Sequence, residues 1–138
     1  MITAGGTKEK IDPVRYITNC SSGKMGIALA DCAHSLGADV TLVSTFGIEK
    51  PYRNIVTESA QEMEKAVKAN LSEQDCVVMA AAVADYRIKE YSEQKMKKGS
   101  SDSITLELVK NPDILKEISA INCKAKIEIG RASCRERV

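Results

Sequence analysis

The sequence predicts an α/β domain of three layers, with helices on both faces of a mainly parallel sheet. Apolar, β-branched segments alternate along the 138 residues with segments that carry small and apolar residues at helical spacing. This alternation is typical of parallel strands joined by helical crossovers. The longest apolar segment, CVVMAAAVA at residues 76–84, has no polar face, as expected for a strand covered on both sides.

Each expected element carries its own start or stop signal. Strands are expected at residues 2–4, 38–45, 75–84 and 104–109, and helices at residues 26–36, 59–71 and 111–121. Gly37 stops the first helix, and Ser59 with Glu62 forms a capping box for the second. Asn111 is expected as the cap of the third helix, with Pro112 in its first turn. Together these elements describe a Rossmann-like domain.

Both ends of the chain differ from those expected of a complete domain. The first strand is very short before its glycine turn, whereas a central strand usually has about five or six residues. Residues 126–138 begin as a strand and then become charged without apolar periodicity. The string EIGRASCRERV also resembles a forward translation of a widely used sequencing adapter. We therefore predict a partial domain at residues 1–127 and a non-native, adapter-derived tail at residues 128–138.

Composition excludes several classes of protein. The chain has 20 basic and 19 acidic residues and no run of like charge that would mark a tail, which argues against a nucleic-acid partner. Its longest apolar segment is too short to span a bilayer, and no N-terminal signal is visible, so we expect no membrane partner and a cytoplasmic location. The five cysteines are scattered singly, which predicts reduced thiols and no zinc site.

The segment NCSSGKMG, residues 19–26, contains the glycines and small hydroxyl residues of a phosphate-binding loop. It is not a Walker loop, because Thr18 and Met25 occupy the positions of a required glycine and a required Ser or Thr. It is not a dinucleotide fingerprint either, because Ser21 replaces the first glycine and the segment lies about fifteen residues after the strand. Neither standard phosphate motif therefore explains it.

Two interpretations of this segment remain open. A Ser/Gly loop at a helix start exposes backbone N–H groups that, with the helix dipole and the charge of Lys24, favour an anion. Alternatively, Gly23 and Gly26 serve only to let the helix pack close to the sheet. Composition alone does not choose between them.

Charged residues also lie where connections leave the expected sheet. Asp12 and Arg15 belong to a long connection after the first strand, and long connections in compact α/β units are usually functional. Without further context, a surface ion pair between the two is the favoured interpretation. Asp85 follows the apolar segment at the strand end where ligands bind in open α/β sheets, although it could equally cap the following turn.

Residues 89–103 are polar and rich in lysine, and we expect them to form a surface loop. Within them, Lys95, Lys97 and Lys98 lie close together. A solvated loop is the favoured interpretation of such a run. The alternative is a basic arm that holds phosphates, because flexible ammonium groups suit a polyphosphate.

Four of these segments together resemble a known family. They are ITAGGTKEKIDPVRYITNCSSGKMG, AAVADYR, KMKK and LVKNPDIL, and the likeness extends over residues 2–127. They are similar to the phosphopantothenate–cysteine ligases of the bacterial, CTP-dependent type. In many bacteria this ligase is the C-terminal half of a bifunctional coenzyme A biosynthesis protein.

The resemblance implies a two-step reaction that uses CTP and Mg²⁺. The carboxylate of 4'-phosphopantothenate attacks the α-phosphorus of CTP and releases pyrophosphate, and the amine of cysteine then displaces CMP from the acyl-cytidylate. The resemblance makes Asn19 the catalytic residue, while the ligands of Mg²⁺ stay unassigned. It implies nucleotide contacts at Met79, Ala80, Ala81, Asp85, Lys95, Pro112, Asp113, Ile114 and Leu115. It implies substrate contacts at Ser21, Ser22, Gly23, Lys24 and Ala82, and a homodimer in the full-length parent.

The chain also departs from the family. The family continues after residue 127 with further strands and lysines that are absent here, so we expect this chain alone to be inactive. Two alternatives remain. A Rossmann-type NAD(P)-dependent oxidoreductase requires an acidic residue after the second strand, where only Ser44 and Thr45 occur. A non-catalytic nucleotide-binding module requires only part of the site.

Overall fold

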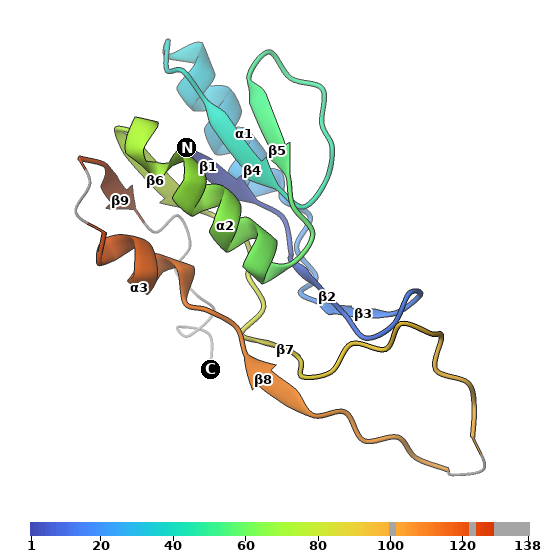
Figure 1. Ribbon diagram of the computed structural model, residues 1–138. Helices are drawn as coiled ribbons and strands as arrows, with labels where there is room; N and C mark the ends of the chain where they lie inside the picture. The colour runs from blue at the N-terminus through green and yellow to red at the C-terminus, as the bar shows by residue number, and fades with distance from the viewer. Residues whose placement is uncertain (100–101, 122–123, 129–138) are drawn as a thin grey trace, which may run out of the picture.

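The computed structural model describes residues 1–99, 102–121 and 124–128, and Figure 1 shows their layered arrangement. Within these residues, a five-stranded sheet forms the middle layer. Its strands are β1 (Ile2–Ala4), β4 (Thr41–Ser44), β5 (Arg53–Val56), β6 (Cys76–Met79) and β9 (Lys126–Glu128). Their spatial order is β5-β4-β1-β6-β9, and every pairing between neighbours is parallel. The predicted parallel α/β class is confirmed.

The strand order reverses between β1 and β6. From β1 the chain continues outward to β4 and β5 on one side, and later returns to place β6 and β9 on the other. The connections that follow β1 and β6 therefore diverge from a common point at the carboxyl end of the sheet. In open sheets of this kind, the crevice at that point is where ligands bind.

Helices cover both faces of the sheet (Figure 1). The helices are α1 (Lys24–Ser35), α2 (Ala60–Asn70) and α3 (Ile114–Ser119), and a short 3₁₀ turn, η1 (Leu71–Glu73), follows α2. One core, beside α1, contains Ile2, Ala4, Ala30, Val40, Leu42 and Tyr52. The other, beside α2 and α3, contains Met1, Val43, Met63, Val67, Leu71, Val77, Met79, Ile114 and Ile118. Neighbouring residues such as Leu42 and Val43 belong to opposite cores because successive strand side chains alternate between faces.

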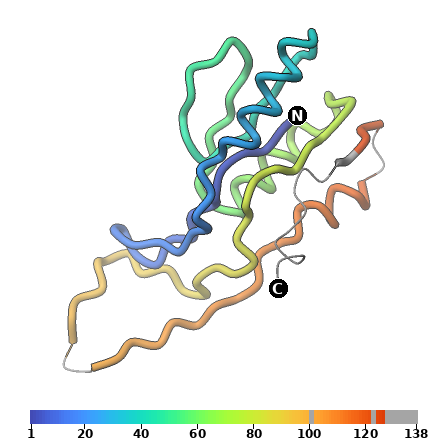
Figure 2. The backbone as a smooth tube through the Cα atoms, turned by 180° about the vertical axis from the view of Figure 1, so that it is seen from behind, coloured from blue at the N-terminus to red at the C-terminus, as the bar shows by residue number. Residues whose placement is uncertain are grey.

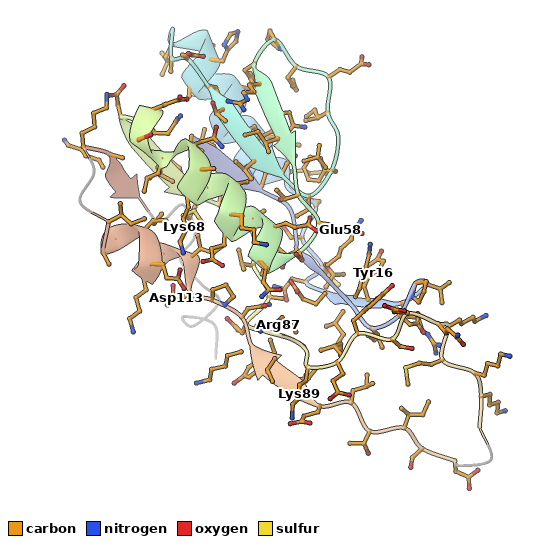
Figure 3. The ribbon with its side chains drawn as sticks, viewed as in Figure 1. Tyr16, Glu58, Lys68, Arg87, Lys89 and Asp113 are labelled. Atoms are coloured by element: carbon orange, nitrogen blue, oxygen red, sulfur yellow. The ribbon has the colours of Figure 1, made fainter. Side chains whose placement is uncertain are left out.

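Ion pairs join the two helices that share a face. Lys68, which Figure 3 shows on α2, pairs with Glu117 on α3 and also with Glu64 within α2. These contacts raise the pKa of Lys68 and lower that of Glu117. The pairs are partly exposed, so apolar packing holds this layer more than charge does.

Two antiparallel hairpins extend from the carboxyl end of the sheet. The first pairs β2 (Lys8–Lys10) with β3 (Tyr16–Thr18), and the second pairs β7 (Tyr86–Ile88) with β8 (Leu108–Lys110). Figure 2 shows the first hairpin beside the yellow-to-orange chain that leaves β7. The sequence did not predict either hairpin, nor β5.

Several predicted boundaries were wrong. Helix α1 begins at Lys24, β6 ends at Met79 and β8 covers only Leu108–Lys110. Asn111 does not cap α3, and Pro112 precedes the cap instead of lying in the first turn. Asp113 caps α3, since its carboxylate accepts a hydrogen bond from the Lys116 amide at 3.0 Å, while Ser59 caps α2 as predicted. The proposed tail at residues 128–138 lies outside the described residues except for Glu128, so it stays a prediction.

Candidate functional site

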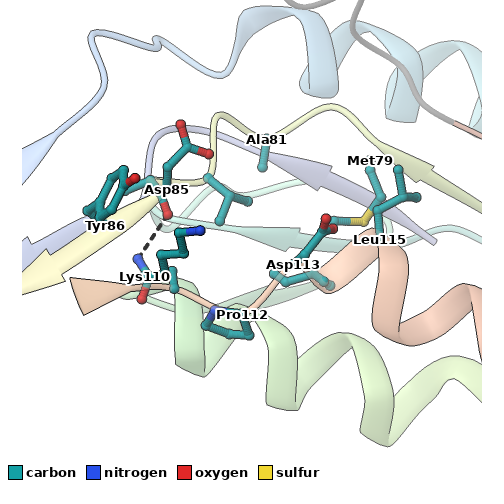
Figure 4. Close-up of a pocket in the computed structure, with 12 residues that line it drawn as sticks. Met79, Ala81, Asp85, Tyr86, Lys110, Pro112, Asp113 and Leu115 are labelled. Atoms are coloured by element: carbon teal, nitrogen blue, oxygen red, sulfur yellow. Dashed lines mark hydrogen bonds between the residues drawn. The ribbon is translucent and has the colours of Figure 1, made fainter.

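Two cavities lie at the carboxyl end of the sheet, on either side of the connection that follows β6. The first, of about 540 Å³, is bounded by this connection and by the chain that enters α3 (Figure 4). The second, of about 800 Å³, is bounded by the same connection and by residues 19–26. The residues that line both are Met79, Ala81, Val83 and Asp85. This connection is therefore a common wall at the switch point of the sheet.

Buried threonines hold the common wall in place. The hydroxyl of Thr3 accepts a hydrogen bond from the Ala81 amide at 3.0 Å, and that of Thr7 accepts one from the Ala84 amide at 2.9 Å. Both threonines are fully buried. The backbone after β6 is thus bonded to β1 and its following turn, not to a further strand, which explains why β6 ends at Met79.

Asn19 reaches this wall from the side of the second cavity. Its side-chain nitrogen donates to the carbonyls of Ala82 at 3.2 Å and Val83 at 3.4 Å. The residue is exposed, and its carboxamide oxygen has no hydrogen bond to any described residue. Asn19 is therefore a solvent-facing carboxamide with an available acceptor, at the common wall of the two cavities.

The start of α1 forms the opposite side of the second cavity. Gly23 precedes the helix with φ of 73°, and no described side chain caps the helix, so its first backbone N–H groups lie beside the cavity without a described side-chain partner. A Cβ on Gly26 would lie 2.6 Å from the Cβ of Ala4 and 2.7 Å from the Thr3 carbonyl. The two interpretations of this segment are thus compatible: glycine permits close packing, and the packing leaves N–H groups available to an anion.

The first cavity is closed by the chain between β8 and α3. The Asn111 amide donates to the Asp85 carbonyl at 2.8 Å, and its side-chain nitrogen donates to the Ala84 carbonyl at 2.9 Å. Figure 4 shows Asp85 on the common wall opposite Pro112 and Asp113. Asn111, expected as a helix cap, instead links the two walls of this cavity.

Most residues implicated by sequence meet at these cavities. Those lining the second are Asn19, Ser21, Ser22, Gly23, Lys24, Ala80 and Ala82, with Met79, Ala81 and Asp85 shared. Those lining the first alone are Pro112, Asp113, Ile114 and Leu115. Lys95 lines neither cavity. Sequence reasoning missed the supporting residues Thr3 and Thr7, whose only signal was a hydroxyl in an otherwise apolar strand and glycine turn.

The carboxylates at the first cavity can be compared with the needs of Mg²⁺. Within the described parts of the chain, no group of three or more His, Cys, Asp or Glu side chains could hold a metal ion. Asp85 and Asp113 nevertheless both line the first cavity. Mg²⁺ is commonly held by one or two carboxylates together with substrate phosphates, so these residues fit an ion that arrives with a nucleotide.

The fold and the site define a doubly wound α/β domain with a small-molecule site at its switch point. The chain belongs to the family described as "DNA/pantothenate metabolism flavoprotein C-terminal domain", which matches residues 1–138. No helix in the described part of the chain has the length and apolar character needed to cross a membrane.

Named relatives agree with this family. The coenzyme A biosynthesis bifunctional protein CoaBC of Vibrio vulnificus is 51% identical over 137 residues, which are 96% of this chain and 34% of that protein. The crystal structure of a CoaBC C-terminal domain matches with a TM-score of 0.77 and 42% identity, over 91% of this chain and 60% of that one. A Cab2 mutant in complex with phosphopantothenate-cysteine shares the fold at 17% identity, with a TM-score of 0.73, over 91% of this chain and 61% of that one. The chain thus spans about a third of the length of the curated relatives it matches.

Proposed function

We propose that this chain is part of a ligase that joins 4'-phosphopantothenate to L-cysteine through an acyl-cytidylate made from CTP. The observation that carries the proposal is the position of Asn19, which lines the second cavity and whose carboxamide is hydrogen-bonded to the wall common to the two cavities. A reaction that joins an acid, a nucleotide and an amine requires such a meeting point. The identity to CoaBC supports the same conclusion.

In the first step, a carboxylate oxygen of phosphopantothenate bonds to the α-phosphorus of CTP, and the bond to the β-phosphate oxygen breaks to release pyrophosphate. We assign the nucleotide to the first cavity, where Asp85 and residues 112–115 lie. Mg²⁺ bound with the nucleotide would neutralise phosphate charge, and Asp85 and Asp113 are the residues that would hold it. Most of the rate enhancement then comes from positioning.

In the second step, the cysteine nitrogen bonds to the acyl carbon and CMP leaves with the electron pair of the acyl–oxygen bond. We assign the acyl end and the pantothenate chain to the second cavity, beside Ser21, Ser22 and the start of α1. The available oxygen of Asn19 accepts a hydrogen bond from the incoming amine. Its nitrogen, already near two carbonyls, fixes the orientation of the carboxamide.

The remaining assignments are part of the same proposal. Lys95 contacts the triphosphate, and because it lines neither cavity, its side chain must extend from its segment toward the nucleotide. The enzyme acts in the cytoplasm as a homodimer. An NAD(P)-dependent oxidoreductase is less well supported, because β4 ends at Ser44, whose hydroxyl donates to the carbonyl of Phe46 and offers no acid to a ribose.

The test follows the two steps separately in the full-length gene product. Pyrophosphate release from CTP should require phosphopantothenate, and amide formation should require cysteine. Asn19→Asp should retain pyrophosphate release and slow amide formation roughly 100-fold, because a carboxylate cannot donate to the Ala82 and Val83 carbonyls that orient the side chain. Release of pyrophosphate without phosphopantothenate would exclude the proposed first step.

A matched control makes the same chemical change elsewhere. Asn70 ends α2, and its side-chain nitrogen donates to the Ala66 carbonyl at 2.8 Å, away from both cavities. Asn70→Asp should leave both steps near the wild-type rate. Full amide formation by Asn19→Asp would remove Asn19 from its proposed role.

A further inference from the structure

The lysine-rich segment, residues 89–99, is anchored to the first hairpin at two points. Only Ser92 and Met96 within it are half-buried, and the other residues of the segment are exposed. The Ser92 amide donates to the Ile11 carbonyl at 3.1 Å. The Met96 peptide is held on both sides: its N–H donates to Asp12 at 3.1 Å, and its carbonyl accepts from Arg15 at 2.6 Å.

Asp12 organises this anchor. Its Oδ1 accepts from the backbone amides of Val14 and Arg15 at 2.9 and 2.8 Å, which closes the hairpin turn. Its Oδ2 accepts from the Arg15 guanidinium at 2.9 and 2.6 Å and from the Met96 amide. The Asp12 side chain is fully buried although Arg15 is 45% exposed, so the pair is not the simple surface ion pair expected from sequence.

We propose that Asp12 is a positioning residue, which with Arg15 holds the Met96 peptide so that Lys95 and Lys97 are presented to the nucleotide phosphates. This proposal rests on the proposed function for its nucleotide. The two lysines flank Met96, the one residue of this segment whose backbone N–H and carbonyl are both engaged by the hairpin. Fixing this peptide reduces the conformational freedom that the segment would otherwise lose when it contacts a ligand.

A single isosteric change separates the anchor from the turn. Asp12→Asn can still accept the Val14 and Arg15 amides through its remaining oxygen, so the turn is retained. Its amide group would then face two further donors, the Met96 N–H and the Arg15 guanidinium, and the anchor would be lost. Asp31→Asn is the matched control, because Asp31 pairs with Lys50 and Tyr52 away from both cavities.

The first measurement does not depend on activity. In the full-length gene product, tryptic cleavage after Lys95, Lys97 and Lys98 is mapped by mass spectrometry. Asp12→Asn should be cleaved there roughly tenfold faster than wild type, the ratio expected for losing a hydrogen bond to a charged group. Asp31→Asn should be cleaved at the wild-type rate. An unchanged rate in Asp12→Asn would overturn the anchor.

The second measurement connects the anchor to the nucleotide. Asp12→Asn should raise the KM for CTP about five- to tenfold while kcat at saturating CTP and the KM for cysteine stay within about twofold. A merely structural defect would lower kcat, and Asp31→Asn should show neither change. Faster cleavage with an unchanged KM for CTP would overturn the positioning role. Absence of CTP-dependent turnover in wild type would instead reject the proposed function, and cleavage would still decide the anchor.

A second variant covers the case in which Asp12→Asn does not fold. Met96→Pro removes the N–H that Asp12 accepts without changing the hairpin. It should accelerate cleavage after Lys97 and Lys98 and raise the KM for CTP in the same way. Wild-type values for both would contradict the proposal independently.

Discussion

Residues 19–26, which lead into α1 and are called the α1 turn below, and the lysine-rich segment at residues 89–99 are both proposed to contact substrates, but different interactions hold them. The α1 turn is packed so closely that a Cβ on Gly26 would meet β1, and one on Gly23 would meet the Phe46 ring. The segment is largely exposed and is tied to the hairpin through Ser92 and Met96. Backbone packing thus shapes one region, and a few hydrogen bonds shape the other.

This difference predicts which property a substitution in each region should change. Close-packed backbone cannot yield without moving its neighbours, so changes in the α1 turn should be measured first as lost stability. The segment contributes little buried apolar surface, so changes there should leave stability nearly constant and appear in nucleotide binding. The proposed substrate site therefore combines one rigid wall with one tethered arm.

The largest expected effect is a loss of stability caused by a substitution in the α1 turn. In Gly26→Ala, the added Cβ would meet the Ala4 Cβ at 2.6 Å and the Thr3 carbonyl at 2.7 Å, and neither can move without displacing β1. We expect the free energy of unfolding to fall by about 2 kcal/mol, as is typical of overpacking at a fixed backbone. Chemical denaturation of the full-length gene product would measure it.

Gly47→Ala is the matched control. Apart from its two chain neighbours, no heavy atom of the described residues would lie within 4 Å of a Cβ on Gly47. This variant should change the free energy of unfolding by less than about 0.5 kcal/mol. Equal stability of the two variants would show that α1 can shift away from β1, and the contrast between the rigid α1 turn and the tethered arm would fail.

A smaller effect, on the KM for CTP, is expected from a substitution in the lysine-rich segment. Lys95→Gln should raise the KM for CTP roughly tenfold, corresponding to about 1.4 kcal/mol for a lost charge-assisted contact. The free energy of unfolding and the KM for cysteine should not change. Initial rates at varied CTP and at varied cysteine would measure the two KM values, and chemical denaturation would measure the free energy of unfolding.

Lys124→Gln provides the comparison for this charge change. Lys124 pairs with Asp75 at 3.0 Å, and because Asp75 directly precedes β6, the pair lies at the amino end of the parallel sheet. Both variants remove one positive charge, but only Lys95→Gln should affect CTP. An equal rise in KM for both would indicate a general effect of net charge.

Much of the fold was predictable because its signals are local. Strand and helix alternation gave the parallel class, and Ser59 with Glu62 marked the start of α2 correctly. The errors arose where a long-range bond replaced a local one. Asn111 has the side chain of a cap, but its amide is used by the Ala84 carbonyl, so capping of α3 falls to Asp113.

The site was predictable in part for the same reason. Residues 19–26 and 79–85 form contiguous motifs, and parallel topology brings the ends of β1 and β6 together. The anchor at Asp12 was not predictable, because its partner is a backbone peptide 84 positions away. A peptide group has no residue-type signature, so the sequence offered only Arg15 as a partner and a surface pair as the interpretation.

The smallest expected effect is the response of this anchor to mild acid. Burial alone would raise the pKa of Asp12, but hydrogen bonds from backbone amides and from the Arg15 guanidinium outweigh it and lower the pKa to about 2. Because the folded pKa lies below the unfolded value of about 3.9, the stabilisation is complete above that value and is lost as pH falls through about 2. The ¹³C carboxyl signal of Asp12 should therefore stay constant from pH 7 to about pH 4, where an ordinary aspartate is already half protonated. A midpoint near pH 4 would mean that the carboxylate is not held as described, and that the segment is no better anchored than its exposure suggests.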